Sequence, residues 1–201
     1  MHVTAFIVIN LEASMKKLLS LFLIALLAAP AFGLEVAGVK LDDTAKVGDA
    51  SLALNGAGLR TRMFIKVYVG ALYLAKKAAA GDAAISDTGA KRVSLHMLRD
   101  LKAEQISSAL NEGLVANNSA ADIAKLEGKI KEFTNVLNSA GNAKKGDVIN
   151  IDYLPGTGTR VSINGDSKGT VAGEDFNRAL LKVWLGDKPV DADLKKGMLG
   201  G

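Results

Sequence analysis

The run Met63–Leu74 constrains the fold more than any other segment of the chain. It is dominated by β-branched and aromatic residues and contains no proline, which favours an extended strand. Alternation along that strand puts Tyr68 and Leu72 on one face and Val67 and Val69 on the other, so both faces are largely apolar. A strand of this kind has to be covered on both sides. We therefore expect Met63–Leu74 to be a central strand of a sheet.

The other segments follow the order strands, helices, strands, helix. Asp42–Asp49 is rich in turn residues, and Ala78–Gly89 is typical of a loop of small residues. The further predicted strands are Leu34–Lys40, Ser51–Asn55, Arg92–Leu98, Val148–Leu154, Arg160–Ile163 and Lys168–Ala172. The dipeptide Asn164-Gly165 between the last two indicates a tight hairpin, because both residues tolerate a positive φ.

Four helices are predicted from caps and helical spacing. Asp100 is the expected cap of the first, and Ser119 with Asp122 forms a capping box at the start of the second, which Gly141 ends. Glu174–Leu185 is the third, and Asp191–Met198 is a short fourth. This order predicts an α+β fold, with one large antiparallel sheet and its helices gathered on one face.

Composition narrows the class of protein. The chain has 201 residues, a net charge of +4, two histidines and no cysteine. The basic residues are scattered in separate pairs, which does not favour nucleic-acid binding. The absence of cysteine excludes disulfides, thiol catalysis and cysteine-ligated metals.

The first 33 residues have the pattern of a targeting segment. Met15 is followed by Lys16 and Lys17, an apolar stretch and the small residues of Ala31–Gly33. The apolar stretch is shorter than a membrane span requires. We expect residues 1–33 to be an upstream extension plus a signal peptide starting at Met15, and residues 34–201 to be one domain. The domain would be exported to a periplasmic or extracellular location, without stable membrane insertion once the signal is removed.

Arg60 and Tyr68 are the residues most able to carry chemistry. Arg60 follows two glycines, Gly56 and Gly58, which let the backbone bend or approach another element closely. Because apolar strands flank it, Arg60 needs an anionic or carbonyl partner. That partner is either a ligand or, for a structural arginine, another residue of the chain. Tyr68 falls on the same side of the strand pattern, either as a ligand donor or as a core tyrosine.

Three segments together resemble the chalcone isomerase family. They are Gly56–Arg60, Phe64–Leu74 and Phe176–Val190. The resemblance is to the bacterial exported branch of the family, and it extends over nearly all of residues 34–201. The family includes true isomerases, fatty-acid-binding proteins and non-catalytic relatives, and its fold is an open-faced β-sandwich. The resemblance implies that Arg60 is the family arginine, and that Tyr68 stands where the fatty-acid-binding branch also has tyrosine.

The resemblance also implies that the isomerase chemistry is absent. The isomerases use a tyrosine and an asparagine on the first helix, and these positions are Ile106 and Gly113 here. We therefore expect non-catalytic binding of a small amphiphilic or aromatic ligand, fatty-acid-like, rather than an enzyme. The expected ligand-binding residues are Arg60, Tyr68, Met97, Ile106, Leu110, Gly113 and Phe133. No metal site is expected.

Three alternatives to the leading hypothesis stay open at this point. The first is an isomerase or lyase acting on a conjugated carbonyl compound, with Arg60 as electrophile and Tyr68 as acid. The second is an exported haem binder, because a haem iron needs only one or two axial ligands, for which His96, Met97 or Tyr68 would serve. No cofactor is expected otherwise. A domain with no ligand is the fourth reading.

Overall fold

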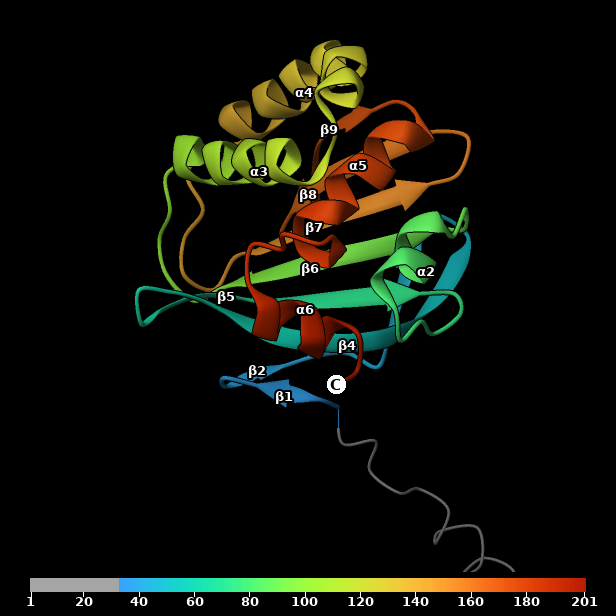
Figure 1. Ribbon diagram of the computed structural model, residues 1–201. Helices are drawn as coiled ribbons and strands as arrows, with labels where there is room; N and C mark the ends of the chain where they lie inside the picture. Colours follow the sequence, from blue (N-terminus) through green and yellow to red (C-terminus); the bar gives the residue numbers. More distant parts are fainter. Residues whose placement is uncertain (1–32) are drawn as a thin grey trace, which may run out of the picture. The chain divides into compact units, whose positions relative to one another are not determined.

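A computed structural model of the chain describes residues 33–201. The predicted upstream extension and signal peptide, up to Phe32, lie outside the described residues. Within them, the structure has a single large sheet, a small hairpin and five helices (Figure 1).

Seven antiparallel strands form the sheet in simple sequence order, β3-β4-β5-β6-β7-β8-β9. The strands are β3 (Thr44–Val47), β4 (Ala50–Arg62), β5 (Ile65–Leu74), β6 (Lys91–Met97), β7 (Val148–Leu154), β8 (Gly158–Ile163) and β9 (Asp166–Val171). The strands β1 (Glu35–Val36) and β2 (Val39–Lys40) pair separately as a hairpin. The expected central strand is confirmed, because β5 lies between β4 and β6 and is buried from Val67 onward.

The sheet is curled, so that its first strand returns over the back of the middle strands. Arg92 on β6 donates a hydrogen bond to the carbonyl of Lys46 on β3 at 3.2 Å, although β4 and β5 lie between these two strands in the sheet. An apolar cluster that includes Leu41, Val47 and Val69 fills this back face.

All five helices lie on the other face of the sheet (Figure 1). They are α2 (Gly81–Ser86), α3 (Ala103–Asn117), α4 (Ala120–Ala140), α5 (Glu174–Leu185) and α6 (Ala192–Met198). The main core lies between them and the sheet, and α5 contributes most to it through Phe176, Leu180, Val183 and Trp184, all 1% exposed or less. The α+β prediction, with helices on one face, is confirmed.

Several local predictions were wrong. The turn-rich segment contains strand β3, and the small-residue loop contains helix α2, because apolar packing of Val47, Ala84 and Ile85 outweighs weak local preference. Asp100 does not cap α3. Its carboxylate accepts a hydrogen bond from the backbone N–H of Lys145 at 2.8 Å, while Gln105 accepts from the N-cap N–H.

Strand β4 is much longer than predicted and includes both glycines before Arg60. A Cβ on Gly56 would lie 2.3 Å from the carbonyl oxygen of Gly197, and one on Gly58 would lie 2.9 Å from the backbone of Leu194. The close approach expected at these glycines is therefore confirmed, and the approaching element is α6. Asn55 adds to this contact by donating a hydrogen bond to the carbonyl of Met198 at 2.8 Å.

Candidate functional site

Strand pairing places Arg60 beside Tyr68. The two are register partners on β4 and β5, next to an irregularity in the pairing between Arg60 and Thr61. The guanidinium carbon of Arg60 lies 5.5 Å from the centre of the Tyr68 ring, within the range of a cation–π contact. The antiparallel register thus brings together two residues that the sequence singled out separately.

Arg60 and Tyr68 line a small cavity between the sheet and α3. Its volume is about 30 Å³. The other lining residues are Leu95, Met97, Leu101, Gln105, Ile106, Ala109, Leu110 and Ile149. A cavity of this size holds no more than two or three water molecules. The walls are apolar except for Arg60, the Tyr68 hydroxyl and Gln105.

Arg60 has no protein partner for its charge among residues 33–201. Its buried Nε donates no hydrogen bond, and no carboxylate of these residues lies within 4.0 Å of the guanidinium. Arg92 and Arg160 provide the contrast, because both bind the buried carboxylate of Asp152, at 2.6 and 3.2 Å. Arg60 is partly buried and lies against the Tyr68 ring, but its charge is not neutralised by a carboxylate of residues 33–201.

Tyr68 is held in place by the chain's one tryptophan. The indole N–H of Trp184 on α5 donates to the Tyr68 hydroxyl at 2.9 Å, and both side chains are buried. Burial raises the pKa of Tyr68, and the nearby positive charge of Arg60 opposes that rise. The hydroxyl therefore stays protonated at neutral pH, and its own hydrogen is not used in any hydrogen bond to residues 33–201.

The predicted site residues divide into two groups. Arg60, Tyr68, Met97, Ile106 and Leu110 line the one cavity. Gly113 and Phe133 do not. Gly113 is the contact point between α3 and α5, since a Cβ there would lie 2.7 Å from Val183, and Phe133 packs against Phe176 with ring centroids 5.3 Å apart.

Sequence reasoning missed Trp184 as a site residue. The helical spacing of α5 identified it only as a core residue, and its link to Tyr68 joins positions 116 residues apart. Gln105 was also missed. Its position on the first turn of α3 was visible in the sequence, but its place at the cavity depends on how α3 crosses the sheet.

His96 lies on the opposite face of the sheet from the cavity. Its neighbour Met97 points into the main core, whereas the imidazole of His96 lies 3.2 Å from the Ser94 hydroxyl on the back face. Burial lowers the pKa of His96. His96 therefore does not share a site with Met97 and Tyr68, the other two candidate haem ligands.

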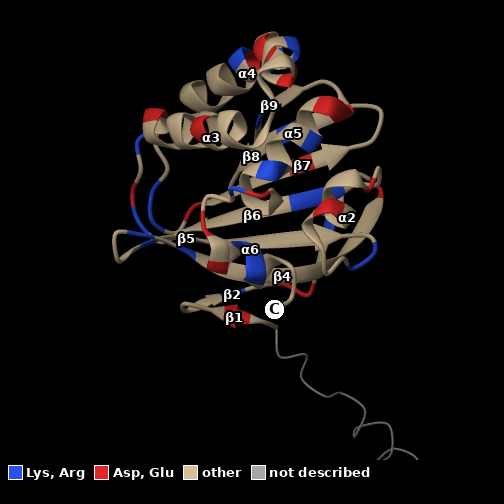
Figure 2. Cartoon of the chain, in the orientation of Figure 1, with Lys and Arg blue, Asp and Glu red and all other residues tan. Residues whose placement is uncertain are grey.

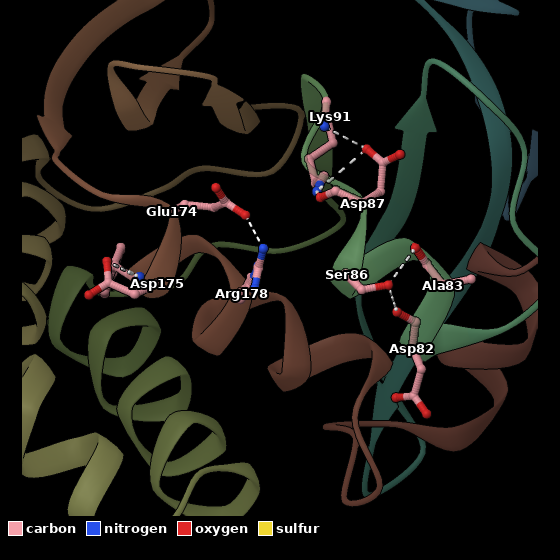
Figure 3. Close-up of polar contacts among 10 residues, drawn as sticks. Asp82, Ala83, Ser86, Asp87, Lys91, Glu174, Asp175 and Arg178 are labelled. Carbon is pink, nitrogen blue, oxygen red and sulfur yellow. Dashed lines mark hydrogen bonds and ion pairs between the residues drawn. The ribbon is translucent and has the colours of Figure 1, made fainter.

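A second, larger hollow lies between α2, α4 and α5. This groove has a volume of about 440 Å³ and is lined by both acidic and basic side chains, including Asp122, Lys125 and Lys182. Figure 3 shows that several charges near it are already paired, as Arg178 is with Glu174 and Lys91 with Asp87. The mixed charge distinguishes it from the apolar cavity beside Arg60.

Residues 33–201 offer neither a metal site nor a membrane span. These residues contain no cluster of three or more histidine or acidic side chains placed to hold a metal ion. No helix among them is long and apolar enough to cross a bilayer.

Comparison with known proteins agrees with this fold. The family model described as chalcone isomerase-like matches residues 33–200, so the chain belongs to the chalcone isomerase-like family. A fatty-acid binding protein of Arabidopsis thaliana has a similar structure, with a TM-score of 0.62 and 16% sequence identity, covering 83% of this chain and 94% of that one. No curated protein matches the sequence. At that identity, the structural likeness concerns the fold alone.

Proposed function

We propose that this protein binds a small apolar carboxylate, fatty-acid-like, without catalysing a reaction on it. The observation that carries the proposal is the guanidinium of Arg60 beside an apolar cavity, with no carboxylate partner in residues 33–201 and no hydrogen bond from its buried Nε. A carboxylate would accept charge-assisted hydrogen bonds from Arg60 and a further one from the free hydroxyl hydrogen of Tyr68. The similar Arabidopsis structure is that of a fatty-acid binding protein, which supports the same ligand class.

The cavity has to enlarge before it can hold the apolar tail of such a ligand. Ligand pockets generally enclose roughly 300 Å³ or more, whereas the cavity beside Arg60 encloses about 30 Å³. Met97 is the most adaptable wall residue, because its side chain is unbranched. Ile106 and Leu101 on the α3 side are only partly buried. Binding would therefore involve new rotamers of these side chains or movement of α3 away from the sheet.

The composition of the cavity argues against an isomerase. Orienting substrate oxygens and moving a proton require several polar groups in fixed positions. Ile106 brings no such group to the cavity, and Gly113 contacts Val183 instead of lining it. What remains is a cation, one hydroxyl and one amide, which is a set suited to holding an anion.

The test is titration with a long-chain acid and with its methyl ester, followed by calorimetry or by the fluorescence of Trp184, the only tryptophan. The acid should bind and the ester should bind far more weakly. Arg60→Met should weaken acid binding by about 2–5 kcal/mol, and Arg60→Lys should restore it only in part, because an ammonium lacks the planar fork. Tyr68→Phe should cost less, about 1–2 kcal/mol.

Arg62→Met is the matched control, because Arg62 is exposed and lies on the same strand. It should bind the acid as the wild type does. Unliganded Arg60→Met should be at least as stable as the wild type, since it removes a cation that has no partner. Equal affinity for acid and ester, or no loss in Arg60→Met, would show that Arg60 has only a structural role.

A further inference from the structure

The turn between β4 and β5 presents three consecutive apolar side chains to solvent. Phe64 is 101% exposed, Met63 77% and Ile65 48%. Scattered apolar side chains are normal on a protein surface, but a continuous exposed group marks an interaction site. In Figure 1 this hairpin extends past the ends of the neighbouring strands, so its tip stands clear of the helical layer.

The backbone of this turn does not suit the residues it contains. Arg62 and Ile65 pair, which leaves a two-residue turn in which Met63 has a φ of 47° and Phe64 a φ of 64°. Bulky residues are strained at positive φ, and such turns favour asparagine and glycine. The same sheet uses Asn164-Gly165 in the equivalent turn between β8 and β9, with φ of 52° and 90°. Met63 and Phe64 are therefore unfavourable residues for the turn they form, which indicates that their exposed side chains serve another purpose.

Basic residues surround this apolar tip. The backbone N–H of Leu98 bonds the Val67 carbonyl at 3.0 Å, and that of Met97 bonds the Asp147 carbonyl at 2.9 Å, so the loops at 98–102 and 143–147 lie at the same end of the sheet as the tip. The hairpin and these two loops carry six cations and two carboxylates. They are Arg62, Lys66, Arg99, Lys102, Lys144 and Lys145, with Asp100 and Asp147. Figure 2 shows basic segments grouped around the tan hairpin tip.

We infer that this end of the molecule docks on an anionic lipid surface, with Met63, Phe64 and Ile65 entering the bilayer interface. An apolar tip flanked by exposed cations is the combination that binds such surfaces, because apolar burial and attraction to acidic lipids act together. The contact would be peripheral and reversible, which is compatible with the lack of any spanning helix in residues 33–201. The inference goes beyond the proposed ligand site and does not depend on it.

The experiment is vesicle co-sedimentation with the double variant Met63→Asn/Phe64→Gly. Wild type should bind vesicles of phosphatidylcholine with about a third phosphatidylglycerol, bind pure phosphatidylcholine weakly, and release at high salt. The variant should lose about tenfold or more of its partitioning. It should also melt at the same temperature or higher, because it adopts the residues that the turn prefers. A loss of binding therefore could not be ascribed to unfolding.

Two further variants separate the two contributions. Arg62→Gln/Lys66→Gln should reduce binding and its salt dependence together, while Val115→Asn, which replaces an apolar side chain 62% exposed on α3, should leave binding unchanged. Equal partitioning of wild type and Met63→Asn/Phe64→Gly, or no preference for acidic lipid, would overturn the inference. So would lipid-free self-association of the wild type that the double variant abolishes, because the tip would then bind a second copy of the chain.

Discussion

The hydroxyl oxygen of Tyr68 accepts a hydrogen bond from the protein, and its hydrogen is free to be donated to a ligand in the cavity. Trp184 occupies the acceptor side, and burial holds the pKa of Tyr68 above its usual range, so the donor side persists throughout the neutral range. Arg60 lies against the ring of Tyr68, and its buried Nε donates no hydrogen bond within residues 33–201. At the scale of single residues, the site thus contains two hydrogen-bond donors, the Arg60 guanidinium and the Tyr68 hydroxyl, that face a cavity without an acceptor. This arrangement is the basis for proposing a carboxylate ligand.

His96 gives a prediction about acid stability. Burial lowers its pKa in the folded protein, so the unfolded chain binds the proton more tightly. Stability from this residue should be fully present above the unfolded pKa of about 6.5 and should fall as the pH drops through that value toward the lower folded pKa. Urea unfolding at several pH values should show a steeper acid loss for wild type than for His96→Gln.

The same measurement contains its control. Asp147 and Asp175 also have lowered pKa values, through hydrogen bonds with Asn164 and Lys129, and they are unchanged in the variant. Their contribution is lost at lower pH in both proteins alike. Identical slopes for wild type and His96→Gln as the pH falls from the unfolded histidine pKa toward the lower folded pKa would contradict the prediction.

At the scale of elements, β4 holds the cavity residue Arg60 at one end and receives α6 along its middle. Gly56 and Gly58 permit this approach, and Asn55 reinforces it with hydrogen bonds to Met198 and to Ala78 in the following loop. Asp191 completes the contact, since its carboxylate caps α6 and accepts from the Thr61 N–H at 3.0 Å. The segment that resembles the family motif therefore has a packing role as well as carrying the arginine.

Gly58→Ala tests that packing role. Its new Cβ would lie 2.9 Å from backbone atoms of Leu194, so α6 would have to shift. We expect a loss of roughly 1–3 kcal/mol in the free energy of unfolding. Gly128→Ala on α4 is the matched control. No atom lies within 4 Å of its new Cβ, so it should stabilise the helix by about 0.5–1 kcal/mol. Denaturant titration measures both, and equal effects would argue against the contact.

At the scale of the described domain, one sheet separates two apolar layers. The helices cover the front, where the cavity lies, and the β1–β2 hairpin with β3 covers part of the back. Both the Arg60 cavity and the apolar hairpin tip belong to the β4–β5 pair. The long hairpin thus connects the proposed ligand site with the proposed lipid contact through continuous backbone.

The export prediction belongs at this scale. If the signal is removed as expected, mass spectrometry of the exported protein should place its N-terminus within two residues of Leu34. A chain that starts at Leu34 retains the hydrogen bond from the Leu41 N–H to the Leu34 carbonyl, 2.9 Å long, and the whole β1–β2 hairpin. By contrast, a chain that starts at Leu41 should be less stable, because it lacks Val36 and Val39, which pack on the back-face cluster. Recovery of exported protein that retains Met15 would contradict the prediction.

The sequence by itself determined the elements whose local pattern and final environment agree. β5, β6, the β7–β9 meander and α5 were predicted from alternation, turn residues and helical spacing, because these patterns are those that the sheet and its helical cover require. Met63 and Phe64 were wrongly assigned to the strand. Their apolar character fits a buried strand, and nothing local signals that they form a turn with positive φ.

Only the tertiary structure decided which residues share the site. Arg60 and Tyr68 were found from the sequence, but their contact depends on the β4–β5 register. The Trp184 hydrogen bond and the positions of Gly113 and Phe133 away from the cavity depend on how helices cross the sheet. Periodicity reports which face of an element is apolar, but it does not report which neighbour that face meets. Long-range packing settles that pairing, and the cavity follows from it.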